Sequence, residues 1–259
     1  MTRAVEVAIS TGFRHLDCAM FYANEEEVGA AIATSLQKHG LKREDVFVTS
    51  KVLIRVLKEL YPECSFYVKS MHLRIYKEGV EFDVRNPNSI VFENYKLEDI
   101  WRSIGVSNFN KRQIERILES CTIPPAVNQV EVNIHWLNTK LIGFCLSKNI
   151  LVEGYAPLGS PGLMKGKVKP LLEEESVLEI AHKHKKTPAQ VLLRHGLQRG
   201  IIVIVKSVTP DRIRSNFDVF DFELTGEEME KLNKTGSNKR LFVFDSLANH
   251  PEYPFYDEY

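Results

Sequence analysis

An acid, a phenol and an amine follow one another near the amino terminus at spacings that suit proton transfer. Asp17 ends a short apolar run at 13–17, Tyr22 follows five positions later, and Lys51 comes directly after the apolar run 46–50. A free tyrosine has a pKa of about 10. A buried ammonium within about 4 to 6 Å lowers that pKa, and a carboxylate keeps the ammonium charged. The spacing predicts Tyr22 as a proton donor, Lys51 as the cation that lowers its pKa, and Asp17 as the partner of Lys51. Spacing alone leaves open that Asp17 caps a turn, Tyr22 packs and Lys51 is solvated.

The elements that would hold these residues alternate between strand and helix patterns. Asn24 is a favourable N-cap residue for a helix that ends at Gly40. Residues 201–205 form a β-branched run typical of a buried strand. Such alternation, with largely apolar strands, predicts a parallel sheet covered by helices. We count about seven candidate strands, whereas a closed barrel of this type has about eight.

Composition narrows the function classes. The chain has 259 residues, 44% of them apolar, and 34 basic side chains balance 34 acidic ones. This balance provides no field that would favour nucleic acid or an acidic membrane surface. Four scattered cysteines without metal-ligand spacing predict reduced thiols, a cytoplasmic protein and no metal site. No apolar run approaches the length of a membrane span, about 18 to 20 residues.

Several segments resemble the aldo-keto reductase family. They are residues 13–29 with Ser50 and Lys51, then 104–110, 126–131, 154–160, 205–212 and 250–255. They occur in order along nearly the whole chain, and the weak stretch is about 52–102. The resemblance implies a single domain, residues 1–259, with a (β/α)8 TIM-type barrel. It also implies NADPH-dependent reduction of an aldehyde or ketone, in which Tyr22 protonates the developing alkoxide.

The family also places a histidine at the end of its fourth barrel strand, in a His-Trp-Pro context, where it orients the carbonyl. His72 precedes residues 77–82, which look like the family's loop after that strand. His135, followed by Trp136, resembles the motif itself better, but it lies where the family has an ordinary loop. We assign the role to His72, which lacks the Trp-Pro that should follow, and keep His135 as the alternative.

No Gly-x-Gly-x-x-Gly follows a strand, so a Rossmann cofactor site is excluded. A barrel can instead bind an extended cofactor across the face where its βα loops converge. Ser107, Asn108 and Gln129 follow or end predicted strands, and their hydroxyl and amides can bond a carboxamide. Tyr155 ends another strand and can stack on a flat ring. The resemblance implies that these four residues hold the nicotinamide.

A second polar group lies late in the chain. Lys206 ends the last predicted strand, Thr209 precedes a helix that begins with proline, and Arg212 lies in its first turn. A cation, a hydroxyl and the amides of a helix start together favour an anion. The resemblance implies that this is the 2′-phosphate site that selects NADPH. The other cofactor positions that it implies are Ser207, Val208, Asn216, Leu158 and Ser160.

The chain is shorter than the resemblance requires. It lacks the family's first barrel strand, and the 20 residues between Lys51 and His72 must hold both a crossover helix and a strand. Pro62 interrupts that helix, and Arg102 alone separates Trp101 from Ser103. We therefore expect an incomplete barrel, without its first strand and parts of its third and fourth βα units, and with reduced stability.

Two alternatives to an active enzyme stay open. One is a catalytically impaired NADPH-binding or structural protein derived from the family, because the dinucleotide motifs survive better than the histidine strand. The other is an unstable fragment without function. For the enzyme we expect a monomer that acts on a small carbonyl compound and needs no nucleic acid or membrane.

Overall fold

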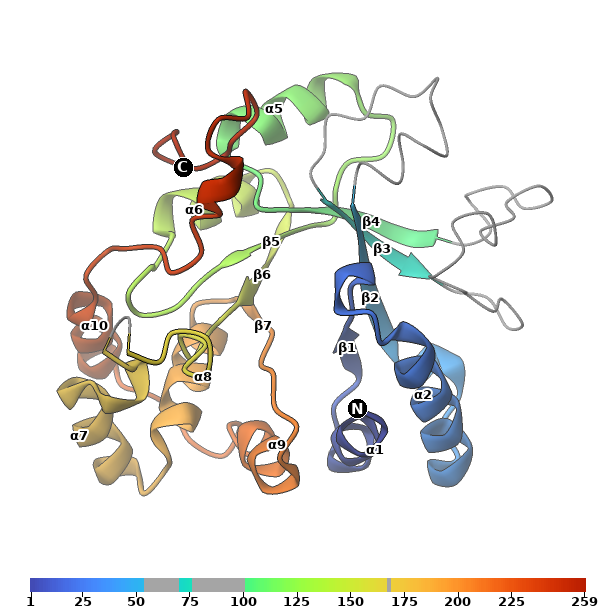
Figure 1. Cartoon of the computed structure of the whole chain (residues 1–259). Helices are drawn as coiled ribbons and strands as arrows, with labels where there is room; N and C mark the ends of the chain where they lie inside the picture. The colour runs from blue at the N-terminus through green and yellow to red at the C-terminus, as the bar shows by residue number, and fades with distance from the viewer. Residues whose placement is uncertain (54–69, 76–100, 167–168) are drawn as a thin grey trace. The chain divides into compact units, whose positions relative to one another are not determined.

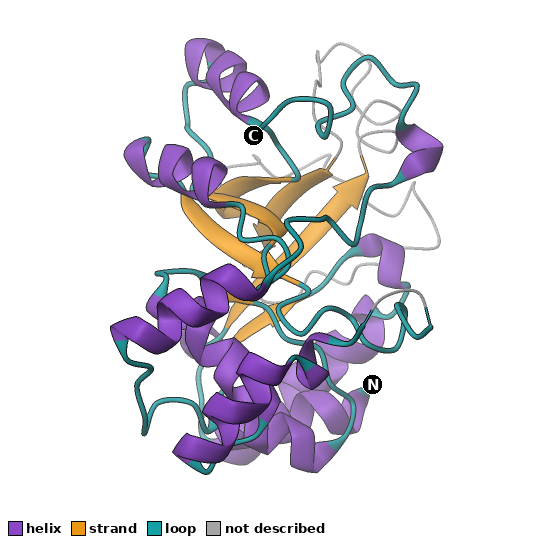
Figure 2. Cartoon of the chain, turned by 90° about the vertical axis from the view of Figure 1, so that its left-hand side faces the viewer, coloured by secondary structure: helices purple, strands orange, loops and turns teal. Residues whose placement is uncertain are grey.

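The computed structural model describes residues 1–53, 70–75, 101–166 and 169–259 (Figure 1). For residues 52–53, 70–75 and 101–102 it describes the backbone alone. Two compact units account for the chain. Figure 2 shows the helices and strands of the chain in separate colours. The first comprises Met1–Ser107 and Ser207–Phe217, and the second comprises Asn108–Lys206 and Asp218–Tyr259. A single domain over residues 1–259 stays a prediction.

The first unit places helices beside a small sheet. Its elements in chain order are α1 (Thr2–Thr11), β1 (His15–Asp17), the 3₁₀ helix η1 (Met20–Tyr22), α2 (Glu25–His39), η2 (Arg43–Asp45), β2 (Phe47–Leu53), β3 (Ser70–Ile75), β4 (Trp101–Ser107) and α9 (Pro210–Phe217). Helix α2 has acidic residues in its first turn, where the helix dipole favours negative charge. It ends at Gly40, whose φ of 63° suits glycine. The predicted bounds of this helix are therefore confirmed.

The core of the first unit joins α1 and α2 to the first two strands (Figure 1). Its buried members are Val5, Ile9, Cys18, Val28, Ala31, Ile32, Leu36 and Val46. Helix α1 also contacts α9, where the rings of Phe13 and Phe217 lie 4.9 Å apart. Between them Gly12 has a φ of 126°, and a Cβ there would meet the Phe217 ring at 2.6 Å. Only glycine satisfies both conditions.

Strand pairing corrects the prediction of a sheet that is parallel throughout. Strands β1 and β2 are parallel, with Asp17 opposite Thr49. Strand β3, however, runs antiparallel to both β2 and β4. A parallel connection needs a crossover of about a dozen residues or more, whereas an antiparallel one needs only a short turn. Residues 54–69, which join β2 to β3, are only slightly more than this minimum, and a short connection favours the antiparallel arrangement.

The sequence pattern predicts a short helix at 95–101 and a strand at 103–106, whereas strand β4 begins at Trp101. The sequence pattern also predicts a short helix at 54–60, which lies outside the described residues, and a strand at 66–71, of which residues 70 and 71 belong to β3. The described residues contain seven strands, the number expected from the sequence.

The second unit has a parallel sheet with several helices. Its elements are α5 (Lys111–Ser120), β5 (Val127–Glu131), α6 (Thr139–Ser147), β6 (Leu151–Tyr155), η4 (Leu171–Glu173), α7 (Glu175–His184), α8 (Pro188–Gln198), β7 (Ile202–Val203), α10 (Gly226–Thr235) and η5 (Asp245–Leu247). Strands β5 and β6 pair in parallel, as do β6 and β7. Asn110, Thr187 and Thr225 each cap a helix with the side chain and form a capping box.

The core of the second unit lies between α7, α8 and α10. Its buried members are Ile134, Leu171, Val177, Ile180, Ala181, Val191, Leu192, Leu224 and Leu232. Gly154 in β6 permits close packing, because a Cβ there would meet Ile201 at 2.9 Å and Val132 at 3.2 Å. This close contact keeps the strand whose last residue is Tyr155 against its neighbours.

The end of the chain lies beside α5 and α6 (Figure 1). Asn110, the cap of α5, donates through its side chain to the carbonyl of Pro254. Arg116 makes two hydrogen bonds of 2.9 Å to the Glu252 carboxylate. These bonds fix the position of residues 250–257 within the second unit.

The Glu252 contact predicts a pH dependence of stability. Bonds from Arg116, the largest cause, lower the pKa of Glu252 from 4.5 to about 2. A carboxyl with a lowered pKa contributes stability above its ordinary pKa and loses it as the pH falls through the folded value. We expect the melting temperature of Glu252→Gln to lie below that of the natural chain near neutral pH. The difference should narrow as the pH falls below 4.5 toward 2. Thermal unfolding at several pH values checks this, and a gap that stays constant over the window contradicts it.

Candidate active site

Asp17 and Lys51 form a buried ion pair in the first unit. Asp17 is the last residue of β1, and Lys51 lies in the neighbouring parallel strand β2, two residues beyond the partner of Asp17. The Lys51 Nζ lies 2.5 Å from the Asp17 Oδ1, and the side chains are 11% and 10% exposed. Each of the two charges thus has an opposite charge directly beside it. The predicted pairing of these two residues is confirmed.

Tyr22 lies against this pair. It is the last residue of η1, which begins three positions after the end of β1 and contacts β2. The Lys51 Nζ lies 5.4 Å from the centre of the Tyr22 ring, within the range of a cation–π contact. The tyrosine is 50% exposed, so its ring reaches the surface beside the buried ion pair. The structure therefore brings the three predicted residues together.

The pKa of Tyr22 differs from the prediction. Burial, with smaller contributions from Asp17 and Cys18, raises it from 10 to about 12. Lys51 was expected to lower this pKa, but its charge lies 2.5 Å from the Asp17 carboxylate. The carboxylate compensates the lysine's charge and itself disfavours a phenolate. Tyr22 is therefore a protonated phenol at neutral pH.

Further polar groups surround the three residues. The Ser50 hydroxyl donates to the Glu25 carboxylate at the start of α2, and Ser50 is 5% exposed. Burial, and then Glu25 and Asp17, raises the pKa of the Cys18 thiol to about 12. Sequence reasoning assigned no role to Glu25, although it lies within the segment that resembles the family. Its contact with Ser50 spans 25 positions, and no spacing rule indicates such a contact.

The two candidate histidines lie in different units. His72 lies in β3, where its Cα pairs with Lys51 on one side and with Gly105 on the other. The fold thus places the His72 backbone beside the strand that carries Lys51. His135 lies in the second unit, with Nε2 3.1 Å from the Glu174 carboxylate. Its backbone N–H donates to Asn133 and its carbonyl accepts from Lys239. These contacts are those of a histidine that fixes a loop.

The residues expected at the nicotinamide divide between the units. Ser107 ends β4 in the first unit and is 5% exposed. Asn108, Gln129 and Tyr155 lie together in the second. The Tyr155 hydroxyl donates to the Asn108 Oδ1 at 3.0 Å, and the Asn108 N–H donates to the Gln129 carbonyl at 2.9 Å. The Gln129 side chain donates to the buried Glu153 at 2.8 Å. Asn108, Gln129 and Tyr155 thus form one hydrogen-bonded group, in which Gln129 lies within β5 and Tyr155 ends β6.

The loop after Tyr155 holds the two residues expected at the pyrophosphate. Leu158 is partly buried against the core of the second unit. Ser160 has a φ of 48°, and its carbonyl accepts the N–H groups of Leu163 and Met164. These contacts hold the loop in a compact turn.

The residues expected at the 2′-phosphate also divide between the units. Lys206 belongs to the second unit and is exposed. Arg212, in α9 of the first unit, is exposed too, and within the described residues neither cation makes an ion pair with a carboxylate. The Ser207 hydroxyl accepts the Thr209 N–H at 3.2 Å, Val208 is 52% exposed, and Asn216 is buried. An exposed basic side chain without a carboxylate beside it suits a phosphate.

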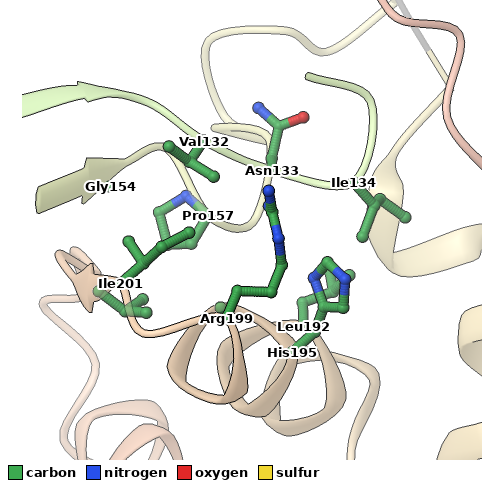
Figure 3. A pocket seen from close by; sticks show the side chains of 11 residues that line it. Val132, Asn133, Ile134, Gly154, Pro157, Leu192, His195, Arg199 and Ile201 are labelled. Atoms are coloured by element: carbon green, nitrogen blue, oxygen red, sulfur yellow. The ribbon is translucent and has the colours of Figure 1, made fainter. Parts of the chain in front are cut away.

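A small cavity lies elsewhere in the second unit, between α8 and the strands (Figure 3). Its volume of about 10 Å³ is room for one water, and its walls include Asn133, Gly154, His195 and Arg199. None of the predicted site residues lines it. We therefore do not assign the cavity to the reaction.

Two features are absent from the part of the chain that the structure describes. No cluster of three or more His, Cys, Asp or Glu side chains there could hold a metal ion. None of the helices described is both long enough and apolar enough to cross a bilayer.

Comparison with known proteins identifies the family. A family profile described as Aldo/keto reductase family matches residues 1–85 and 91–236. Aldo-keto reductase family 1 member C15 of Rattus norvegicus is 39% identical, with 99% of this chain and 89% of the relative covered. Member C3 of Homo sapiens is 38% identical over 293 positions, with 100% and 90% covered. Those 293 positions exceed the 259 residues present here, so the human relative carries residues without a counterpart in this chain.

A solved structure agrees with the sequence relatives. The aldose reductase from Schistosoma japonicum, a (β/α)8 barrel, matches with a TM-score of 0.79 at 39% identity and covers 100% of this chain and 91% of its own. The fold class is therefore α/β, of the (β/α)8 barrel type. The chain belongs to the aldo/keto reductase family, whose members are oxidoreductases that reduce carbonyl groups with NAD(P)H.

Proposed function

We propose that this protein reduces an aldehyde or ketone to an alcohol with NADPH, and that Tyr22 donates the proton. The observation that carries the proposal is the meeting of Asp17, Tyr22 and Lys51: a buried ion pair at 2.5 Å with the phenol ring beside its cation. A carbonyl that gains a hydride becomes an alkoxide, which needs a proton from a nearby acid.

Tyr22 suits the role of that acid. With a pKa raised to about 12 it is protonated at neutral pH, as a donor must be. The Lys51 ammonium beside the ring favours negative charge as the proton leaves, and Asp17 holds the ammonium in place. NADPH, when bound, supplies the hydride. His72, which pairs through its backbone with Lys51, is proposed to orient the carbonyl.

The donor set also fits the cofactor. Asn108, Gln129 and Tyr155 are already oriented by hydrogen bonds to one another or to Glu153, which favours binding because little order is lost. We assign to them, with Ser107, the nicotinamide end. Leu158 and Ser160 would face the pyrophosphate. Lys206, with Ser207, Val208, Thr209, Arg212 and Asn216, would hold the adenosine 2′-phosphate end.

The proposal also includes the class of substrate, the cellular location and the oligomeric state. The substrate is a small carbonyl compound, and we propose that the protein works as a cytoplasmic monomer without nucleic acid or membrane. The second candidate function is a catalytically impaired NADPH-binding or structural protein. It is favoured by the antiparallel direction of β3, the strand of His72.

Two measurements separate these functions. Quenching of tryptophan fluorescence by NADPH tests cofactor binding, and the loss of NADPH absorbance with a simple aldehyde tests turnover. Binding with turnover supports the reductase. Tight binding without turnover for a series of aldehydes and ketones supports the impaired binder, and no binding at all contradicts both the reductase and the NADPH binder.

Cofactor choice gives a further prediction. We expect Lys206→Ala and Arg212→Ala each to raise the Kd for NADPH about tenfold, since bonds to charged groups contribute about 1.5 to 3 kcal/mol. The Kd for NADH, which lacks the 2′-phosphate, should stay within about twofold. Fluorescence titration with both cofactors measures the difference.

Arg214→Ala is the matched control. Arg214 lies on the same helix as Arg212 but is ion-paired with Asp211 at 2.9 Å. Its replacement should leave both Kd values unchanged. An equal loss of NADPH and NADH affinity in the Lys206 and Arg212 variants would remove the phosphate role from these residues.

A further inference from the structure

Glu131, at the end of β5, has a buried carboxylate that binds a distant segment. The side chain is 0% exposed. Its Oε1 accepts the Leu241 N–H at 2.9 Å, and its Oε2 accepts the Phe242 N–H at 3.0 Å. The Asn133 side chain donates to Oε1 at 3.1 Å. One carboxylate thus fixes two successive backbone amides, 110 and 111 positions later in the chain.

Arg240, which precedes Leu241 and Phe242 in the chain, lies against two aromatic rings. Its guanidinium lies 4.3 Å from the Trp136 ring centre and 4.1 Å from that of Phe255. The Asn133 side chain that bonds to Glu131 also accepts the Trp136 N–H at 3.0 Å. The segment 240–242 is therefore held in two ways. The Glu131 carboxylate binds its backbone amides, and the Arg240 guanidinium contacts two aromatic rings.

Phe242 carries this arrangement to the proposed cofactor site. Its ring lies edge-on to the Tyr155 ring, with centres 5.7 Å apart and an angle of 76° between the planes. The Tyr155 hydroxyl is bonded at its other end to Asn108. The Tyr155 ring is thus constrained by its contact with the Phe242 ring and by the hydrogen bond of its hydroxyl to Asn108.

We infer that Glu131 is a positioning residue, which holds Phe242 against Tyr155 and so sets the ring on which the nicotinamide stacks. This inference rests on the proposed function in its last step only, because the link from Glu131 through Phe242 to Tyr155 exists without cofactor. A loosened segment would free the Tyr155 ring, and ordering that ring again would weaken cofactor binding.

Glu131→Gln tests the link with little change in shape. A carboxylate accepts at both oxygens, whereas an amide accepts at one and presents an NH₂ group to the other donor. The variant must therefore lose either the Phe242 bond or the bonds from Leu241 and Asn133. Phe242→Leu is the complementary variant, since it removes the ring and leaves the backbone bonds in place.

Glu228→Gln is the matched control for loss of a buried carboxylate. Glu228 is 6% exposed and accepts bonds from Lys183, His184 and Thr225, but it makes none with residues 240–242. Its replacement should lower stability without reaching Tyr155.

The first readout needs no cofactor. With fluorine-labelled tyrosine, the Tyr155 signal, assigned with Tyr155→Phe, should shift or broaden in Glu131→Gln and in Phe242→Leu, but not in Glu228→Gln. Amide exchange in the segment 240–242 should quicken in Glu131→Gln and stay unchanged in Phe242→Leu. An unaltered Tyr155 signal in folded Glu131→Gln would overturn the inference, whatever the cofactor does.

The second readout connects the link to binding. We expect Glu131→Gln and Phe242→Leu each to raise the Kd and KM for NADPH about tenfold with kcat little changed, and the double variant to lose no more than either single one. Additive losses in the double variant would contradict the shared route. If the natural chain binds no NADPH, the proposed function fails, while the fluorine and exchange results still decide whether Glu131 holds Tyr155.

Discussion

Tyr22→Phe is expected to reduce carbonyl turnover about 100- to 10,000-fold, the range that a positioned acid contributes. The substitution removes one hydroxyl and leaves the ring beside the Lys51 ammonium, which lies 5.4 Å from the ring centre in the natural chain. Cofactor affinity should stay within about twofold, because the proposed cofactor residues do not include Tyr22. Steady-state turnover with a simple aldehyde and fluorescence titration with NADPH measure the two quantities.

Phe21→Leu is a suitable control beside it. Phe21 belongs to the same 3₁₀ helix but is 81% exposed, so its replacement should leave turnover unchanged. A Tyr22→Phe variant that keeps full turnover would show that another group donates the proton.

Lys51→Met should cost both stability and activity. It leaves the Asp17 carboxylate, 10% exposed, without the ammonium that lies 2.5 Å away. Removing one partner of a buried ion pair costs about 3 to 5 kcal/mol, since the remaining charge is uncompensated. Turnover should fall as well, because no cation then favours the phenolate that forms as Tyr22 gives up its proton. Denaturant unfolding and aldehyde turnover measure the two effects.

A double variant separates the two roles of Lys51. Asp17→Asn with Lys51→Met removes both charges, so most of the lost stability should return. Turnover should stay low, because the cation beside Tyr22 is still absent. Recovery of turnover together with stability would mean that Lys51 acts on folding alone.

Local rules made much of this fold predictable. The capping residues Asn110, Thr187 and Thr225 act within three positions of their partners, so the sequence alone indicates them. The meeting of Asp17 and Lys51 was also predictable, because each lies at or near the carboxyl end of one of two adjacent parallel strands. Parallel neighbours bring such ends to the same edge of a sheet.

Other features depend on balances that spacing does not reveal. The regular alternation of patterns favoured a parallel strand, whereas β3 runs antiparallel to both of its neighbours. The pKa of Tyr22 is raised by burial and then by Asp17 and Cys18, and the spacing of these residues does not reveal the size of these effects. The link from Glu131 to Phe242 joins positions 111 apart, and neither residue belongs to a pattern that points to the other.

The central claim is that this chain delivers a hydride and a proton to a carbonyl, and isotope transfer tests it most directly. NADPH deuterated at the nicotinamide C4 position is incubated with a simple aldehyde, and the alcohol is analysed by mass spectrometry. We expect one deuterium on the carbinol carbon with the natural chain and almost no labelled alcohol with Tyr22→Phe. Bound NADPH without labelled alcohol for any carbonyl compound in a broad series would contradict the claim.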